Sequence, residues 1–139
     1  MENFPISWKL FILITKITDL SLEVFDKQFG ISFTIYHIFA VLNDCPDITQ
    51  RELATQVNVS DAAISKQMTK LSERGLLNVQ VNPNNNRHKQ ISLTDKSIQI
   101  LKDCTQVLDQ LVKEHLDKAG IEMSQFEGQL IDLLASISQ

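Results

Sequence analysis

Two closely spaced helix starts constrain the fold of this chain more than any other feature. The motif TQRE, Thr49 to Glu52, has the spacing of a capping box, in which the threonine hydroxyl and the glutamate carboxylate each satisfy an amide at the start of a helix. Ser60 is a second N-cap residue. We therefore predict a helix from Thr49 to about Gln56, a turn over residues 57–59, and a helix from Ser60 to about Arg74.

The apolar residues of this segment have the spacing of two helices that pack on a common core. The inward positions would be Leu53, Ala54 and Val57 in the first helix, and Ile64, Met68 and Leu71 in the second. Asn58 occupies the turn, where a left-handed backbone is usual and asparagine is tolerated. Two short capped helices joined by a tight turn predict a helix-turn-helix.

A hairpin is predicted directly after the second helix. Residues 75–81 (GLLNVQV) and 89–93 (KQISL) alternate between apolar and polar side chains, as strands do, and the Asn- and Pro-rich segment between them is typical of a turn. A hairpin in this position is a wing.

Longer helices are predicted on both sides of this module. Residues 7–29 would form a helix that Gly30 closes as a left-handed cap, and residues 32–43 a second helix that Cys45-Pro46 stops. Thr94 would cap a helix over 95–118, ended near Gly120, and the motif SQFE at Ser124 predicts a capping box for the last helix. The 7–29 helix has an apolar stripe too broad for one core, which predicts burial against a partner subunit.

Composition fits one ordered, helix-rich domain and conceals a separation of charge. The chain has 139 residues, 43% of them hydrophobic, and a net charge of -4. Residues 48–96 hold seven basic and four acidic residues, a charge of +3, and the rest of the chain carries -7. No apolar run approaches the ~20 residues of a membrane span, and Met1 to Lys9 does not resemble a signal peptide, so a cytoplasmic protein without membrane contact is expected.

The outward face of the 60–74 helix is small and polar, as a helix that enters the major groove requires. Ser65, Lys66 and Gln67 are predicted to contact bases, whereas Lys70 and Gln50 are better placed for phosphate. On the wing, Arg87 would reach a minor groove or a phosphate. The complete predicted DNA-binding set is Gln50, Ser60, Ala62, Ser65, Lys66, Gln67, Lys70, Arg87, His88 and Lys89. The alternatives are a solvated helix face and a solubilising loop.

Enzymatic chemistry has no support in the sequence. His37, His88 and His115 fall on three different predicted elements, and the chain has neither a nucleophile-elbow motif nor a glycine-rich phosphate loop. No cofactor or metal is predicted. Cys45 and Cys104 lack the spacing of a metal knuckle, and redox sensing by either is not favoured.

The order of elements, together with RELA (51–54), LSERGLL (71–77) and an arginine six residues before Leu93-Thr94, resembles the MarR family of bacterial winged-helix transcription regulators. The resemblance implies a mainly α fold with a small β-hairpin, a winged helix-turn-helix over about 46–96 in a single domain of residues 1–139. It also implies a homodimer formed by helices at about 5–30 and 95–139. Such a dimer would bind pseudo-palindromic double-stranded DNA, and a small aromatic effector would release it.

Several residues depart from the family pattern. Asn85 stands where the family wing keeps an acid that holds its arginine, Asn78-Val79 replaces a common arginine, and Ser97 replaces a frequent glycine. The first two departures weaken electrostatic binding to phosphate. An adaptor that contacts protein and binds DNA weakly or not at all is therefore the alternative. Trp8 and Tyr36 are the candidates for lining an effector pocket, and both also fit a plain core role.

Overall fold

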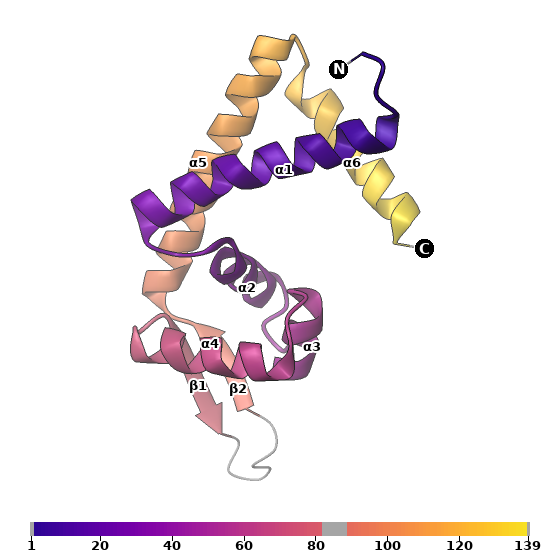
Figure 1. Ribbon diagram of the computed structural model, residues 1–139. Helices are drawn as coiled ribbons and strands as arrows, with labels where there is room; N and C mark the ends of the chain where they lie inside the picture. The colour runs from indigo at the N-terminus through magenta and orange to yellow at the C-terminus, as the bar shows by residue number, and fades with distance from the viewer. Residues whose placement is uncertain (1, 82–88, 139) are drawn as a thin grey trace. The chain divides into compact units, whose positions relative to one another are not determined.

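The computed structural model describes residues 2–81 and 89–138 (Figure 1). Along the chain the elements are α1 (Ile6–Val24), a π-helical turn (Phe25–Phe29), α2 (Phe33–Asp44), α3 (Gln50–Gln56), α4 (Asp61–Glu73), β1 (Leu77–Val81), β2 (Lys89–Leu93), α5 (Asp95–Ala119) and α6 (Met123–Ile137). The chain divides into two compact units, residues 1–104 and 105–139, with the boundary inside α5. This mainly helical architecture with one antiparallel hairpin confirms the predicted fold class.

The predicted helix-turn-helix is confirmed by α3 and α4. Thr49 and Glu52 form the expected capping box at the start of α3, and the Ser60 side chain accepts a hydrogen bond from the Ala63 amide at the start of α4. Asn58 has a φ of 55°, the left-handed conformation that the turn requires. The predicted inward residues of both helices are all buried: Leu53, Ala54, Val57, Ile64, Met68 and Leu71.

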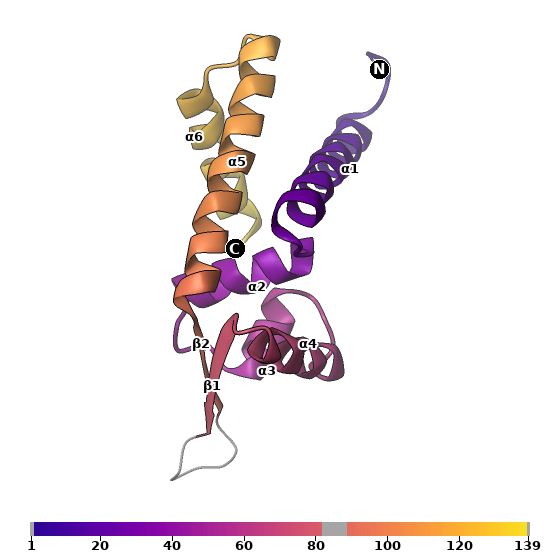
Figure 2. The same cartoon turned by 90° about the vertical axis from the view of Figure 1, so that its left-hand side faces the viewer.

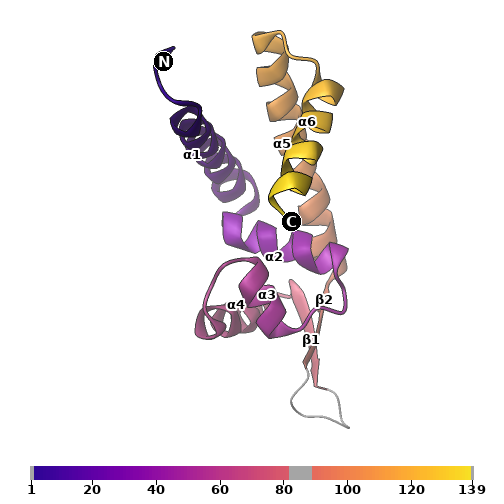
Figure 3. The ribbon, with the colours of Figure 1, turned by 90° about the vertical axis from the view of Figure 1, so that its right-hand side faces the viewer.

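The predicted wing is an antiparallel hairpin in which Leu77 pairs with Leu93, Val79 with Ile91 and Val81 with Lys89. Because successive strand residues point to opposite faces, these six residues share one face of the hairpin. Ile91 and Leu77 on that face are buried. Figures 2 and 3 show α3 and α4 on one side of the two strands. The predicted site residues Arg87 and His88 lie outside the described residues.

The core of the first unit joins α2 to the helix-turn-helix and the hairpin. Its fully buried large side chains are Phe25, Phe39, Ile38, Leu53, Ile64, Leu71, Leu76 and Ile91. Burial of each such side chain is worth roughly 1.5–3 kcal/mol relative to exposure. This core fixes the orientation of α4, whose opposite side remains exposed.

The α1 helix is built as predicted but leaves most of its apolar surface uncovered in the first unit. It continues through the π-helical turn to Gly30, which has the left-handed φ of 61° expected of a cap. Only Ser21 and Val24 of α1 are buried. Large exposed side chains include Ile6 (74%), Ile14 (63%) and Phe11 (59%).

The second unit contains the end of α5 and α6. One prediction here is wrong: α6 begins at Met123, and its cap is Glu122, whose carboxylate accepts from the Gln125 amide at 2.8 Å. The Ser124 hydroxyl instead donates to Glu122. A carboxylate is a stronger acceptor than a hydroxyl, so Glu122 takes the cap position. No described residue of α6 is buried, and its exposed apolar residues are Leu130, Ile131, Leu133, Leu134 and Ile137.

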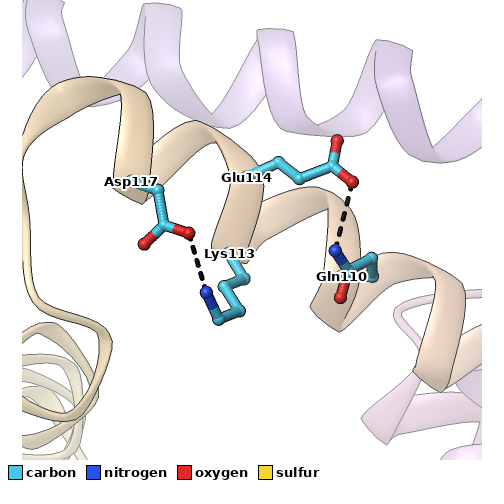
Figure 4. Close-up of polar contacts among 4 residues, drawn as sticks. All are labelled: Gln110, Lys113, Glu114 and Asp117. Atoms are coloured by element: carbon cyan, nitrogen blue, oxygen red, sulfur yellow. Dashed lines mark hydrogen bonds and ion pairs between the residues drawn. The ribbon is translucent and has the colours of Figure 1, made fainter.

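Part of α5 in the second unit carries a solvated polar surface (Figure 4). Lys113 forms an ion pair with Asp117 at 2.7 Å, and the Gln110 amide donates to Glu114 at 3.1 Å. Both pairs span one helical turn, a spacing that supports the helix by a few tenths of a kcal/mol. The exposed partners mark this side of α5 as a surface that faces water.

Candidate nucleic-acid interface

The exposed side of α4 is polar and basic. Lys66 lies two residues after Ile64 and two before Met68, on the side of the helix opposite these buried residues. The predicted contact residues that are exposed on or next to α4 are Ser60, Ala62, Ser65, Lys66 and Lys70. Gln67 is half-buried, at the flank of the helix rather than on its outer side. The outward geometry therefore suits Lys66 for base contact better than Gln67.

Both helices of the module begin with ordered caps. The Thr49 amide donates to Glu52 Oε2 at 2.8 Å, and the Glu52 amide donates to Thr49 Oγ1 at 3.2 Å. The hydrogen bonds with Thr49 hold the pKa of the Glu52 carboxyl below its ordinary value. Ser60 Oγ accepts from the Ala63 amide at 3.1 Å. No acceptor for its hydroxyl hydrogen lies among residues 2–81 and 89–138, so the hydroxyl can donate to a phosphate oxygen.

A groove of about 230 Å³ runs between α4 and the hairpin. Its apolar lining comes from Met68, Val79 and Ile91. The polar lining comes from the start of α3, from α4 and from β2, through Gln50, Ser65, Thr69, Ser72, Glu73 and Lys89. Gln50, Ser65 and Lys89 were predicted site residues, and the fold brings them together here. Thr69, Ser72 and Glu73 were not among the predicted site residues, although the helical spacing of Ser65, Thr69 and Ser72 was a signal that could have revealed the first two.

Hydrogen bonds from two side chains tie the end of α4 to neighbouring parts of the first unit. The Arg74 guanidinium donates to the Gly30 carbonyl at 3.2 Å, and Thr94 Oγ1 donates to the Gly75 carbonyl at 2.9 Å. Gly75 follows α4 with a φ of 69°, so the chain can turn directly into the hairpin. The first bond joins the end of α4 to the segment before α2, and the second joins the turn after α4 to the end of the hairpin.

One family model and one known protein are similar to parts of this chain. Residues 31–89 match the model of the MarR family. Over 111 residues the chain is 26% identical to the uncharacterized HTH-type transcriptional regulator YdgJ of Bacillus subtilis. This match covers 80% of the chain and 66% of YdgJ, which is just under two thirds of that protein. The segment that holds the helix-turn-helix and the first strand of the hairpin is therefore similar to the MarR family.

Solved structures of other proteins share the whole fold. A cysteine-to-serine mutant of MarR from E. coli has a TM-score of 0.79 at 21% identity, with 100% of both chains covered. FabT from Streptococcus pneumoniae, solved in complex with DNA, has a TM-score of 0.77 at 16% identity and covers 96% of this chain and 93% of that chain. At these identities the likeness establishes a shared fold.

The two aromatic residues predicted to line an effector pocket lie in separate aromatic clusters. Trp8 stacks on Phe11 with ring centroids 5.5 Å apart, whereas Tyr36 stacks on Phe25 at 4.8 Å. A cavity of about 630 Å³ at the α1–α2 junction is lined by Leu22, Glu23, Asp26, Lys27, Gly30, Ile31 and Ser32. Neither predicted aromatic residue lines it.

The cysteines differ in their surroundings. Cys104 is buried. Its burial, and to a smaller extent the nearby charge of Asp103, raise the pKa of its thiol to about 11. Cys45 is exposed. Over residues 2–81 and 89–138, no group of His, Cys, Asp and Glu is arranged to hold a metal ion. In the same ranges, none of the helices has the length and apolar character needed to cross a membrane.

Proposed function

We propose that this protein is a homodimeric, sequence-specific DNA-binding transcription regulator, acting as a repressor that a small ligand releases from its operator. The observation that carries the proposal is the exposed polar and basic side of α4, set beside the groove and the wing. The match of residues 31–89 to the MarR family model supports it, as does the similar fold of FabT, which was solved with DNA. The whole chain would act as one functional domain in the cytoplasm, without a cofactor or catalytic activity.

The predicted contact residues fall into two groups by role. Ser65 and Lys66 would read base edges in the major groove, with Ala62 leaving room for close approach. Gln50, Ser60, Lys70 and Lys89 would bind phosphates and hold the register of the protein on the duplex. Arg87 and His88 would add contacts from the wing tip, and Gln67 would contribute from the flank of α4.

Dimerisation follows from the apolar surface of both units. In the first unit the exposed side chains of α1 include Ile6, Phe11 and Ile14, and in the second unit α6 has no buried residue among those described. Such surface favours association with a second copy. Two α4 helices would then address half-sites about one helical turn, ~34 Å, apart, which yields a pseudo-palindromic operator.

Selection of bound duplexes from a random pool tests the proposal, because a dimer of this kind enriches a palindrome. With the selected duplex, Lys66→Ala is expected to weaken binding and relax sequence preference, whereas Arg87→Ala weakens binding without altering preference. Lys102→Ala, which removes an exposed lysine on α5, is the matched control and should change neither. Equal losses for Lys66→Ala on random and selected duplexes would refute its base-reading role.

Repeating the selection with small aromatic acids present tests the effector. Loss of the palindrome with one compound would identify its chemical class, and Trp8→Ala and Tyr36→Ala would show whether either aromatic residue takes part. The alternative function is a winged-helix adaptor for protein contact. Its supporting observation is the outer face of the hairpin, where the exposed side chains of Asn78, Gln80, Gln90 and Ser92 are all uncharged. An adaptor would not shift DNA even at low salt.

A further inference from the structure

The groove between α4 and the hairpin contains one acid and one base on opposite walls. Glu73 extends from the last turn of α4, and Lys89 lies on β2 with its side chain on the same face as buried Ile91. Figure 2 shows the two strands beside α4. Lys89 is the only charged residue in strands 77–81 and 89–93. It is therefore the charge that β2 offers to a phosphate at this groove.

The position of Glu73 is not explained by the stability of its own helix. An acid in the last turn of a helix faces the negative end of the helix dipole, which is unfavourable by a few tenths of a kcal/mol. Among the described residues the ion pairs are Glu23–Lys27 and Lys113–Asp117, so Glu73 and Lys89 are both without an ionic partner there. Both side chains are exposed at the groove.

We propose that Glu73 is a built-in competitor for the DNA phosphate that Lys89 binds, and so sets the affinity of the interface. In the free protein the Glu73 carboxylate attracts the Lys89 ammonium across the groove. When DNA binds, a phosphodiester oxygen pairs with Lys89, and Glu73 is left facing that phosphate across the groove. Binding then loses the attraction within the protein and gains an unfavourable contact. This inference rests on the proposed function and names a residue that opposes it.

The remaining polar lining is consistent with a phosphate at this place. Gln50 supplies amide donors, and Ser65, Thr69 and Ser72 line the same groove with hydroxyls. Thr69 Oγ1 donates to the Ser65 carbonyl at 3.2 Å, so its hydrogen is already used within α4. Lys89 is the charged donor among the residues that line the groove, so competition for it has a direct effect on binding.

A double-mutant cycle with Glu73→Gln and Lys89→Gln tests the inference on the full-length protein. The probes are the selected operator and a random-sequence duplex, each titrated over a range of salt. Glu73→Gln is expected to tighten binding to both duplexes by about two- to fivefold, the range of exposed ion pairs. The gain should shrink as salt rises, because the attraction between the two charges is screened. In the Lys89→Gln background, the gain in affinity from Glu73→Gln should fall to the gain measured for the control variant, Asp109→Asn.

Asp109→Asn is the matched control, since it removes one exposed acid of α5 outside the groove and changes the net charge equally. Urea unfolding of Glu73→Gln should show no loss of stability, which separates the effect from misfolding. Equal gains in the wild-type and Lys89→Gln backgrounds, or a gain no larger than that of Asp109→Asn, would overturn the inference and leave the proposed function intact. Wild-type protein that binds neither duplex at low salt would overturn both.

Discussion

Ser97 allows the sharpest prediction about the stability of this protein. Its side chain is fully buried at the start of α5, where a glycine is common in the family that the sequence resembles. The Thr94 amide donates to Ser97 Oγ at 2.9 Å, Ser97 Oγ donates to the Thr94 carbonyl at 2.9 Å, and the Ser97 amide donates to Thr94 Oγ1 at 3.3 Å. Ser97 therefore acts as the reciprocal member of a capping box, in the position usually held by glutamate or glutamine.

Replacing Ser97 by alanine removes the acceptor of the Thr94 amide and leaves a partly buried N–H without a partner. Loss of a cap costs about 0.5–2 kcal/mol, and an unsatisfied buried donor about 1–3 kcal/mol. The two costs describe the same lost interaction, so they are not added together. The free energy of unfolding should therefore fall by about 1–2 kcal/mol. Ser97→Gly should cost a further ~0.5–1 kcal/mol, because glycine loses more backbone entropy in a helix.

Urea unfolding at one fixed protein concentration measures these differences, since association would couple stability to concentration. The control is Ser92→Ala, an exposed serine on β2, which should lie within about 0.5 kcal/mol of wild type. Thr94→Val removes the other half of the box, and the double variant should cost less than the two single changes added together. A Ser97→Ala protein as stable as Ser92→Ala, or strict additivity with Thr94→Val, would refute the capping assignment.

Three further predictions concern other parts of the chain. The hydrogen bonds with Thr49 lower the pKa of the Glu52 carboxyl in the folded protein. The stability that Glu52 contributes is therefore fully present above the ordinary carboxyl pKa and is lost as the pH falls through the lower, folded-state pKa. The urea midpoints of wild type and Glu52→Gln should then converge in acid. With a pKa of about 11 and a buried thiol, Cys104 should react with an alkylating reagent far more slowly than exposed Cys45, as mass spectrometry of the native protein would show; equal rates would contradict this. Ile14→Glu places a charge on the exposed apolar face of α1 and should shift the protein from dimer to monomer. Size-exclusion chromatography with light scattering measures this change. A variant that remains dimeric would exclude this face from the interface.

Local signals in the sequence predicted most of the winged helix-turn-helix. Caps act over three or four residues, and strand alternation acts over two, so Thr49, Ser60 and Gly30 could be assigned without knowledge of the fold. The same local reasoning failed at Ser124, because two potential caps lie two residues apart and the stronger acceptor, Glu122, took the position. Spacing alone also predicted the broad apolar stripe of α1, and most of that stripe is exposed in the structure.

The sequence by itself determined which segments become helices and strands, which residues face the core, and that the module about 46–96 is basic within an acidic chain. Only the tertiary structure decided which polar residues meet. Gln50, Glu73 and Lys89 lie on three elements, and the packing of α4 against the hairpin places them around one groove. The tertiary structure also decided that Trp8 and Tyr36 do not meet, since Trp8 stacks on Phe11 and Tyr36 stacks on Phe25. Local preferences follow from backbone sterics and hydrogen bonding within a few residues, whereas a site depends on contacts between distant segments that only the packed core fixes.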